Sequence, residues 1–493
     1  MSEGAPANAG AAGWPDPDSA YFAVRSMQVK LHRWAGEDSS RRFGDLFNLV
    51  YDPAFLVAAW ERVSANKGAR TAGIDKATVA MIETWIGVEE FLGQIRDSLK
   101  SGEFRPVEVR QVMIPKKGGK LRKLGIPTVA DRVVQASLKA VLEPVFEADF
   151  RPCSYGFRPN RRAHDAIAEI HHYGTSGYHW VLECDIKACF DEISHTALMD
   201  RLRARIKDKR ICALVKAFLK SGVLTEFGDR EETLTGTPQG GILSPLLANI
   251  ALSALDDHFG RQWHQEMGSD GQRRKRRRNG EGNWKLIRYA DDIVLMVHGE
   301  RRHAEELREQ VTAVLAPLGL RLSPEKTAVV RIDEGFTFLG FDIRRMRKRG
   351  TQKYYVYTRP SRKAVQAIKD KVRARTYRST RHQDLDELLT SLNRSLAGWA
   401  NYFRHGVSKA TFSDIDRHAW HRIMRWIRAK YKQGRHRIGM PELRRRFCDQ
   451  GWRFAWNGVV FTGASSVAVT RYRYRGSTIP TPWNPAPAAA SSG

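Results

Sequence analysis

Two adjacent carboxylates, Asp291 and Asp292, stand between strand-forming apolar runs in the segment LIRYADDIVLMV. A second apolar run, WVLECDI, carries a further carboxylate, Asp185, near its end. If both strands end at the same edge of one sheet, the carboxylates gather at one point and offer the oxygen ligands that Mg²⁺ prefers. Two such ions about 4 Å apart promote phosphoryl transfer by activating a hydroxyl and stabilising the leaving oxygen. The alternative is an ordinary turn, because Asp is a common turn residue.

Two further segments could hold a nucleotide near these carboxylates. In TLTGTPQGGILSPLLANIAL, glycines at positions 240 and 241 would let a nucleotide or a base pair approach the backbone closely, although a packing turn would look the same. The segment VEVRQVMIPKKGGKLRKLGIP alternates apolar and polar residues around a Gly-Gly turn, which predicts a β-hairpin. Its tip carries cations that could hold a triphosphate or simply lie in solvent: Lys116, Lys117, Lys120, Arg122 and Lys123.

The formal net charge of +28 lies almost entirely at one end of the chain. Residues 341–493 contain 33 basic and 9 acidic side chains, a net charge of +24, which leaves +4 for residues 1–340. A segment this basic attracts polyanions through counterion release, so it indicates a nucleic-acid partner. The alternative is that the charge only keeps the protein soluble.

Length and composition indicate a folded protein of about three domains. The 493 residues are 42% hydrophobic and 28% charged, which is globular composition. No apolar run approaches the roughly 18 residues of a membrane span, and the N-terminus has no secretory pattern. The five cysteines form no C-x-x-C pair, which argues against structural zinc and a disulfide framework. We therefore expect a cytoplasmic, bacterial-type protein with no membrane partner, nucleoid-associated when bound to DNA.

The apolar periodicity predicts an α+β fold whose basic C-terminal third is helical. Spacing is helical between about residues 20 and 105, helices and short strands alternate in the middle, and helical spacing returns in FSDIDRHAWHRIMRWIRAKYK. Residues 273–278 are six consecutive basic residues flanked by Gly, Ser and Asn. We interpret them as a mobile loop that contacts a polyanion, although a localisation signal would look similar.

Over roughly residues 45–480, the chain resembles group II intron-encoded reverse transcriptases with maturase function. The resemblance rests on motifs in that family's order: IPKKGGKLRKLGIPTVADRVVQ, SYGFRPNRRAHDAI, ECDIKACFD, GTPQGGILSPLLANI, RYADD and FTFLGF. The strings LNRSLAGWANYF and DRHAWHRIMRWIRAKY look like the family's maturase, or thumb, segment. The resemblance implies a right-hand polymerase with fingers, palm and thumb.

The resemblance also implies roles for single residues. Asp185, Asp291 and Asp292 match the family's catalytic aspartates. Asp185 and Asp291, with the main-chain carbonyl of Ile186, match the ligands of two Mg²⁺ ions, and Asp292 supports them. Phe190 matches the steric gate that crowds a ribose 2′-hydroxyl and so favours deoxynucleotides. The alternative for Phe190 is an ordinary core residue.

Other matched positions concern the nucleotide and the primer. The residues that match the family's nucleotide contacts are Arg110, Lys116, Arg122, Phe190, Gln239 and Gly240. Residues Phe338 to Phe341 resemble the primer grip. The chain departs from many members after residue 450, where it has no paired cysteines of a zinc-binding HNH endonuclease. We therefore expect that any primer comes from elsewhere, such as replication-fork strands.

These observations predict a domain order along the chain. It comprises a disordered N-terminus (1–20), a helical N-terminal or fingers module (21–105), reverse transcriptase fingers and palm (106–345), a thumb or maturase domain (346–435), a basic segment that contacts DNA or RNA (436–477), and a disordered tail (478–493). The expected partners are an intron RNA template, a DNA target or primer, and deoxynucleoside triphosphates. The oligomeric state stays open, with a dimer as one alternative.

The leading hypothesis is an RNA-directed DNA polymerase that also binds intron RNA and assists its splicing and mobility. One alternative is a non-enzymatic RNA-binding splicing factor on a retired polymerase scaffold. Asp185, Asp291 and Phe190 are all intact, which weighs against a retired site. The other alternative is a domesticated or defence-associated reverse transcriptase.

Overall fold

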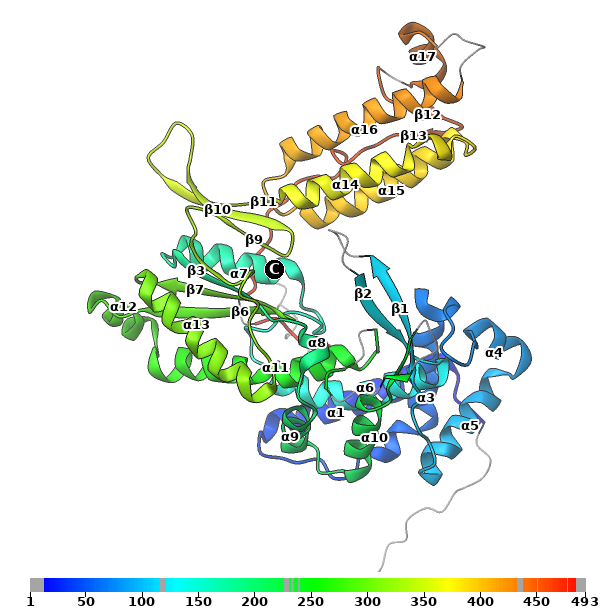
Figure 1. The fold of residues 1–493 in the computed structure, drawn as a ribbon, viewed down its shortest axis with the longest axis vertical. Helices are drawn as coiled ribbons and strands as arrows, with labels where there is room; N and C mark the ends of the chain where they lie inside the picture. The colour runs from blue at the N-terminus through cyan, green and yellow to red at the C-terminus, as the bar shows by residue number, and fades with distance from the viewer. Residues whose placement is uncertain are drawn as a thin grey trace, which may run out of the picture.

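The computed structural model describes residues 13–115, 121–225, 230–231, 235–237, 240–431, 438–449, 451–476 and 478–484. Figure 1 shows three parts: N-terminal helices beside a β-hairpin, a central sheet flanked by helices, and an elongated helical bundle that extends away from the sheet. The α+β fold class predicted from the sequence is confirmed. Within the described residues, no helix combines the length and the apolar character needed to cross a membrane.

The N-terminal helices pack around one almost completely buried helix, α6 (Val129–Asp149). Helix α1 (Pro17–Glu37) begins where Asp16 accepts hydrogen bonds from the N–H groups of Asp18 and Ser19. The predicted disordered N-terminus therefore ends earlier than residue 20, because this cap and Pro17 start a helix. The remaining helices of this part are α2 (Phe47–Val50), α3 (Pro53–Ser64), η1 (Lys67–Arg70), α4 (Val79–Trp85) and α5 (Val88–Ser101).

The predicted hairpin is confirmed. Strands β1 (Val109–Pro115) and β2 (Leu121–Ile126) pair antiparallel, with Ile114 opposite Arg122. β1 also pairs with the short strand β4 (Val223–Leu224), and β5 (Arg230–Glu231) completes this sheet. The hairpin tip, with Lys116, Lys117 and Lys120, lies outside the described residues.

The central sheet is antiparallel, with strand order β6-β7-β3-β8. Alternate residues of β7 enter two different cores: Ile293, Leu295 and Val297 pack on one face, and Val294 and Met296 pack on the other. Both faces are covered by helices, which explains why this strand is an uninterrupted apolar run. The strands are β3 (Trp180–Asp185), β6 (Asn283–Tyr289), β7 (Asp292–His298) and β8 (Ala328–Arg331). The helices around them are α7 (Ala163–Thr175), α8 (Cys189–Glu192), α9 (His195–Arg205), α10 (Lys209–Leu219), α11 (Ser244–Arg261), the π-helix η2 (Gln262–Glu266), α13 (Arg301–Leu315) and η3 (Ala316–Leu318).

A three-stranded sheet joins the central sheet to the bundle. Its strands are β9 (Phe336–Phe338), β10 (Phe341–Arg347) and β11 (Tyr354–Pro360). The bundle contains α14 (Arg362–Arg375), η4 (Arg378–Thr380), α15 (Leu385–Phe403), α16 (Lys409–Lys430) and α17 (Met440–Phe447), with the hairpin β12 (Ala455–Trp456) and β13 (Val459–Val460). Its apolar residues, among them Leu392, Phe412 and Trp426, are buried between the helices.

After β13 the chain runs back from the bundle to the N-terminal helices. Asp416 on α16 accepts hydrogen bonds from the N–H groups of Ala464 and Ser465. Further along, Arg475 forms an ion pair with Asp165 on α7, at 2.6 Å. This C-terminal segment therefore connects the bundle to the central part of the molecule.

The predicted disordered tail needs a correction at residues 478–484. Ile479 and Trp483 are buried, and the Trp483 indole N–H donates a hydrogen bond of 3.0 Å to Gln28 Oε1 on α1. The Trp483 ring also lies near the His32 ring. Pro480 and Pro482 also accept hydrogen bonds, from Asn160 and Arg25, so residues 478–484 are held by contacts with helix α1 and with the central part of the molecule.

The prediction of a mobile loop at residues 273–278 is wrong. These residues belong to helix α12 (Asp270–Arg278), which begins with a capping box between Ser269 and Gln272. The guanidinium of Arg273 lies 4.2 Å from the centre of the Trp263 ring, and Asn283 donates a hydrogen bond to the Arg273 carbonyl. Contacts with the residues just before and just after the helix thus hold a helix that its charge repulsion would otherwise disfavour.

The buried carboxyl of Asp131, in the first turn of α6, should make the stability of the folded protein depend on pH. Burial raises the pKa of this carboxyl to about 6. The folded state therefore binds more protons than the unfolded state between about pH 4 and 6, and the free energy of unfolding falls as the pH rises through that window. Between pH 4 and pH 7.5, we expect the free energy of unfolding of Asp131→Asn to rise by about 3 kcal/mol relative to that of the wild type, as measured by urea unfolding. An unchanging difference between the two proteins would contradict this.

Candidate functional site

The central sheet brings the three predicted aspartates together at one edge. Asp185 ends β3 and lies directly opposite Asp292, the first residue of β7. Asp291 occupies the two-residue turn between β6 and β7 with Ala290, whose φ of 57° is left-handed. Two-residue hairpin turns favour this conformation because its twist matches the strands. The prediction that these carboxylates meet at the end of two strands is confirmed.

The electrostatics of this edge are those of crowded carboxylates. Burial, and then the charges of Asp291 and Asp185, raise the pKa of Asp292 to about 6. Burial and the charge of Asp185 also raise the pKa of Asp291. Burial and Asp292 raise the pKa of Glu183, two residues before Asp185 on β3, to about 7. Negative charge crowded at one point favours the binding of a cation.

Lys326 is a site residue that the sequence reasoning missed. Its Nζ lies 2.7 Å from Asp185 Oδ2, and its charge lowers the pKa values of Asp291 and Asp292. Strand β8 pairs Ala328 with Glu183, and the same register continued by two residues places Lys326 opposite Asp185. The only sequence signal is a lysine just before a short apolar run, which becomes informative only once β8 is known to pair with β3.

The oxygen donors at this edge are of the kind that Mg²⁺ prefers. Within the described residues, no three His, Cys, Asp or Glu side chains form a group that could hold a metal ion by themselves. The candidate donors are therefore the carboxylates of Asp185 and Asp291 and a main-chain carbonyl, a set that leaves positions for water and substrate phosphates. Ile186 and Leu322 lie opposite each other in an antiparallel bridge but exchange no hydrogen bonds. Their neighbours do: Lys187 N–H donates to the Arg321 carbonyl, and Ser323 N–H donates to the Asp185 carbonyl. The Ile186 carbonyl consequently points toward the β7 side, where Asp291 lies.

Phe190 lies on the short helix α8, which follows β3 through Ala188 in the left-handed conformation. The Phe190 ring is half-buried and meets the ring of Phe157 edge-on at 6.5 Å. The Phe190 carbonyl accepts a hydrogen bond from Thr237 N–H, and a Cβ on Gly236 would come within 2.5 Å of the same oxygen. Gly236 and Thr237, directly before the PQG motif, therefore pack against the helix that carries Phe190.

The other residues predicted to contact the nucleotide do not all lie at the aspartates. The positive charge of Arg122 on β2 lowers the pKa of the Asp291 carboxyl. Arg110 donates two hydrogen bonds, of 2.8 and 3.1 Å, to the carbonyl of Ala72, so part of its guanidinium supports the N-terminal helices. Lys116 and Gln239 lie outside the described residues.

Gly240 makes a close approach, but its partner is the hairpin. A Cβ at this position would lie 2.6 Å from the Gly125 carbonyl and 2.9 Å from Leu124 Cδ1, and the φ of Gly240 is +115°. Both features require glycine. The observed contact corresponds to the packing-turn alternative, while the role of Gly240 toward a nucleotide stays a prediction.

Beside the aspartates lies a cavity of about 790 Å³ that reaches the first helix of the bundle. Its lining includes Asp185, Asp292, Lys326, Leu339, Arg362 and Lys363. The turn at Leu339 and Gly340, in the predicted primer grip, is held from the bundle side. The Tyr402 hydroxyl donates a hydrogen bond of 2.8 Å to the Leu339 carbonyl, and the Ser361 N–H donates one of 2.9 Å to the Gly340 carbonyl.

The turn that carries Asp291 is held by a fully buried arginine, Arg288. Its guanidinium donates to both carboxylate oxygens of Asp256, at 2.8 and 2.5 Å, and to the Ala290 carbonyl at 2.9 Å. It also donates to Asn249 Oδ1 and to Ser154 Oγ. Sequence reasoning missed this role, although an arginine inside an apolar strand run is itself unusual, because a buried charge requires a partner.

Comparison with known families gives two matches along the chain. Residues 114–343 match the family model described as reverse transcriptase (RNA-dependent DNA polymerase). Residues 365–444 match the group II intron, maturase-specific domain. The first match covers the hairpin, the central sheet and the aspartates, and the second covers most of the bundle.

Individual relatives are similar over the same region. The chain is 37% identical to the protein YkfC of Escherichia coli over 364 residues, which cover 69% of this chain and 93% of that protein. It is 33% identical to the group II intron-encoded protein LtrA of Lactococcus lactis over 370 residues, 66% of this chain and 60% of LtrA. A putative intron protein of the COX1/OXI3 gene of Saccharomyces cerevisiae is 26% identical over 61% of this chain and 39% of its own length.

Proposed function

Because the chain belongs to the group II intron-encoded reverse transcriptases that carry a maturase domain, we propose that its central sheet is the palm of an RNA-directed DNA polymerase that uses two Mg²⁺ ions. The observation that carries this proposal is the meeting of Asp185, Asp291 and Asp292 at one edge of the sheet. The half-buried ring of Phe190 and the cation of Arg122 lie close to the same edge.

In the proposed reaction, the 3′-hydroxyl of a primer attacks the α-phosphate of a deoxynucleoside triphosphate. The new phosphodiester bond forms as the bond to pyrophosphate breaks, and the hydroxyl proton is lost. When bound, two Mg²⁺ ions would neutralise charge on the attacking and leaving oxygens. Asp185 and Asp291 with the Ile186 carbonyl would hold these ions. Arg122, Arg110 and Lys116 are the proposed contacts of the triphosphate, with Gln239 and Gly240 lining its pocket.

Primer extension on a poly(rA)/oligo(dT) duplex with dTTP tests this proposal. We expect incorporation that requires the RNA strand and Mg²⁺, stops when EDTA is added and resumes when Mg²⁺ is restored in excess. A well-folded protein with no incorporation would contradict the polymerase and favour the non-enzymatic splicing factor.

Phe190 gives a prediction about sugar selection. Its ring would crowd a ribose 2′-hydroxyl, so Phe190→Val is expected to lower the preference for dTTP over UTP by about 10- to 100-fold, as the ratio of kcat/KM values. Phe157→Leu is the control, because Phe157 contacts Phe190 edge-on but is itself half-exposed, and its φ of 57° disfavours a β-branched residue there. Unchanged selectivity in Phe190→Val would mean that Phe190 is only a packing residue.

We propose further that the helical bundle binds intron RNA and assists splicing and mobility. Exposed cations on two of its helices support RNA binding, since they can displace counterions from phosphates: Arg362, Lys363, Lys371 and Arg373 on α14, and Lys409, Arg417 and Arg425 on α16. The bundle coincides with the maturase-specific match. The chain spans 60% of the length of LtrA, so splicing and mobility rest on resemblance in this shared part.

A further inference from the structure

A second cavity, of about 520 Å³, lies beside the edge strand β6, away from the aspartates. It is enclosed by α7, the end of α11, the π-helix η2 and helix α12. Lys285 lines it, four residues before the end of β6 at Tyr289, which is about 13 Å along the strand. None of its lining residues lines the cavity beside Asp185 and Asp292.

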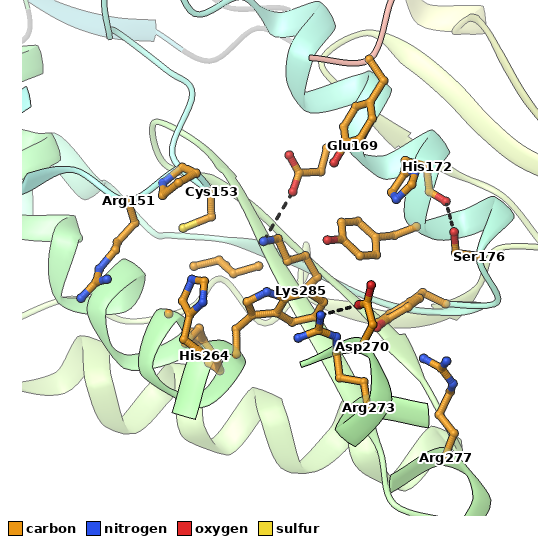
Figure 2. A pocket seen from close by; sticks show the side chains of 18 residues that line it. Arg151, Cys153, Glu169, His172, Ser176, His264, Asp270, Arg273, Arg277 and Lys285 are labelled. Atoms are coloured by element: carbon orange, nitrogen blue, oxygen red, sulfur yellow. Dashed lines mark hydrogen bonds and ion pairs between the residues drawn. The ribbon is translucent and has the colours of Figure 1, made fainter. Parts of the chain in front are cut away.

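Cations held in fixed positions line this cavity. Figure 2 shows Lys285 between Glu169 above and Arg273 below, with Arg277 farther along α12. Lys285 Nζ and the Arg273 guanidinium lie 4.6 and 4.2 Å from the centre of the Trp263 ring. Their side chains are only 16% and 12% exposed. The tryptophan thus orients both cations before any ligand arrives, which lowers the entropy lost on binding.

Positive charge is in excess here. Glu169, 3.7 Å from Lys285, also accepts a hydrogen bond from the buried Tyr155 hydroxyl. Asp270 pairs with Arg273 at 2.5 Å. These two carboxylates face the four cations Arg151, Arg273, Arg277 and Lys285, of which Arg151 also pairs with Asp257 on α11. The pKa of His264, on the same wall, is lowered by burial and by Lys285, Arg151 and Arg273.

Helix α12 presents cations on two faces. Arg273 and Arg277 are partly buried and line the cavity, and the charge of Arg277 lowers the pKa of Tyr178, which burial raises. Arg274, Lys275 and Arg278 are exposed. The cations with fixed positions lie inside the cavity, where they can contact one phosphate group directly. The exposed cations add only general attraction for a ligand that carries many phosphates.

An aromatic surface lies at the rim of the cavity. His172 on α7 and Tyr474 of the C-terminal segment stack with their ring centres 4.5 Å apart and an interplanar angle of 12°. Both side chains are exposed and both line the cavity. An exposed ring face next to fixed cations is the arrangement with which proteins bind unpaired nucleotides, because the base stacks while its phosphate is neutralised.

We propose that this cavity binds one unpaired nucleotide of an RNA chain, with its phosphate at Arg273, Arg277 and Lys285 and its base on the stacked pair of His172 and Tyr474. The choice of RNA rests on the proposed function, while the nucleotide chemistry rests on the cavity itself. The site is separate from the polymerase edge. It would hold RNA on the palm independently of the strand being copied.

The test compares two arginines of the same helix by fluorescence anisotropy with a labelled 12-nucleotide single-stranded RNA over a series of KCl concentrations. Arg277→Gln is expected to raise the Kd about tenfold and to lower the slope of log affinity against log salt by about 0.7, the share of one phosphate on a single strand. Arg274→Gln removes the same charge from the exposed face and is expected to change the Kd less than threefold. Equal effects of the two variants would overturn the proposal.

Two further arms identify the ligand. Tyr474→Leu is expected to weaken RNA binding while leaving the salt slope unchanged, because it removes a stacking surface and no charge; an unchanged Kd would overturn the base contact. AMP is expected to compete only at millimolar concentration, and micromolar AMP binding that is lost in Arg277→Gln, with unchanged RNA affinity, would overturn RNA as the source. Primer extension by Arg277→Gln on poly(rA)/oligo(dT) is expected to match the wild type, which separates this site from the polymerase.

Discussion

Replacing Asp291 by alanine is expected to lower RNA-templated incorporation of dTTP by about 10³-fold. The variant loses a carboxylate from the edge where Asp185 and Asp292 meet, and with it a proposed ligand of Mg²⁺. Stabilisation of transition-state charge by a metal ion is worth several kcal/mol, and each 1.36 kcal/mol is a factor of about ten in rate. Single-turnover primer extension at saturating dTTP measures the loss directly.

The fold should survive this change. Burial and the charge of Asp185 raise the pKa of Asp291, so its charged form is disfavoured in the folded protein without a cation. The variant is therefore expected to unfold at the same temperature as the wild type or slightly higher. Asp200→Ala is the matched control, because this carboxylate on α9 is exposed and, within the part of the chain that the structure describes, forms an ion pair only with Arg203. A polymerase that keeps its rate in Asp291→Ala would contradict the assignment of the active site.

Replacing Arg288 by methionine is expected to lower the free energy of unfolding by about 3–5 kcal/mol, the usual effect of breaking a buried ion pair. Arg288 and Asp256 are both completely buried, so the variant leaves the Asp256 carboxylate without its counter-charge. It also leaves the Ala290 carbonyl without the donor that fixes the turn carrying Asp291. Urea unfolding measures the first effect, and primer extension measures the second.

A double variant separates these two effects. Adding Asp256→Leu to Arg288→Met removes the orphaned charge, and replacing a whole buried pair by apolar residues is often neutral. We expect stability to recover only in part, because the buried acceptors on Ala290, Asn249 and Ser154 still lack the donor that Arg288 supplied. Incorporation of dTTP is expected to stay at least tenfold below the wild type because the turn remains without its donor. Full recovery of activity together with stability would show that Arg288 acts on stability alone. Arg302→Met, at an exposed pair with Glu300, is the control and should change stability by less than about 1 kcal/mol.

The local features of this protein were predictable because they depend on neighbours in the chain. The hairpin at residues 109–126 follows from alternation around a Gly-Gly turn. The convergence of Asp185 with Asp291 follows from two apolar runs that each end in a carboxylate. In the hairpin a periodicity of two residues determines which side chains face the same way, and at the aspartates the ends of the apolar runs determine where the carboxylates lie.

Features that depend on partners outside their own segment were missed or misjudged. Residues 273–278 are a helix in which Arg273 contacts Trp263 and Asn283, each ten positions away along the chain. Residues 478–484 are held by the N-terminal helix α1, where Gln28 accepts a hydrogen bond from Trp483. The local composition, rich in charge in the first segment and in Pro and Thr in the second, indicates disorder, and these contacts outweigh it.

The amino-acid sequence by itself determined the fold class, the family and the carboxylates of the candidate site, since these depend on residue types, short periodicities and motifs in a fixed order. Only the tertiary structure decided that Lys326 reaches Asp185, that Arg288 holds the turn of Asp291, and that cations and stacked rings surround a second cavity. The physical reason is that strand pairing and helix packing bring together residues more than a hundred positions apart, as with Asp185 and Lys326, and no local pattern records that register.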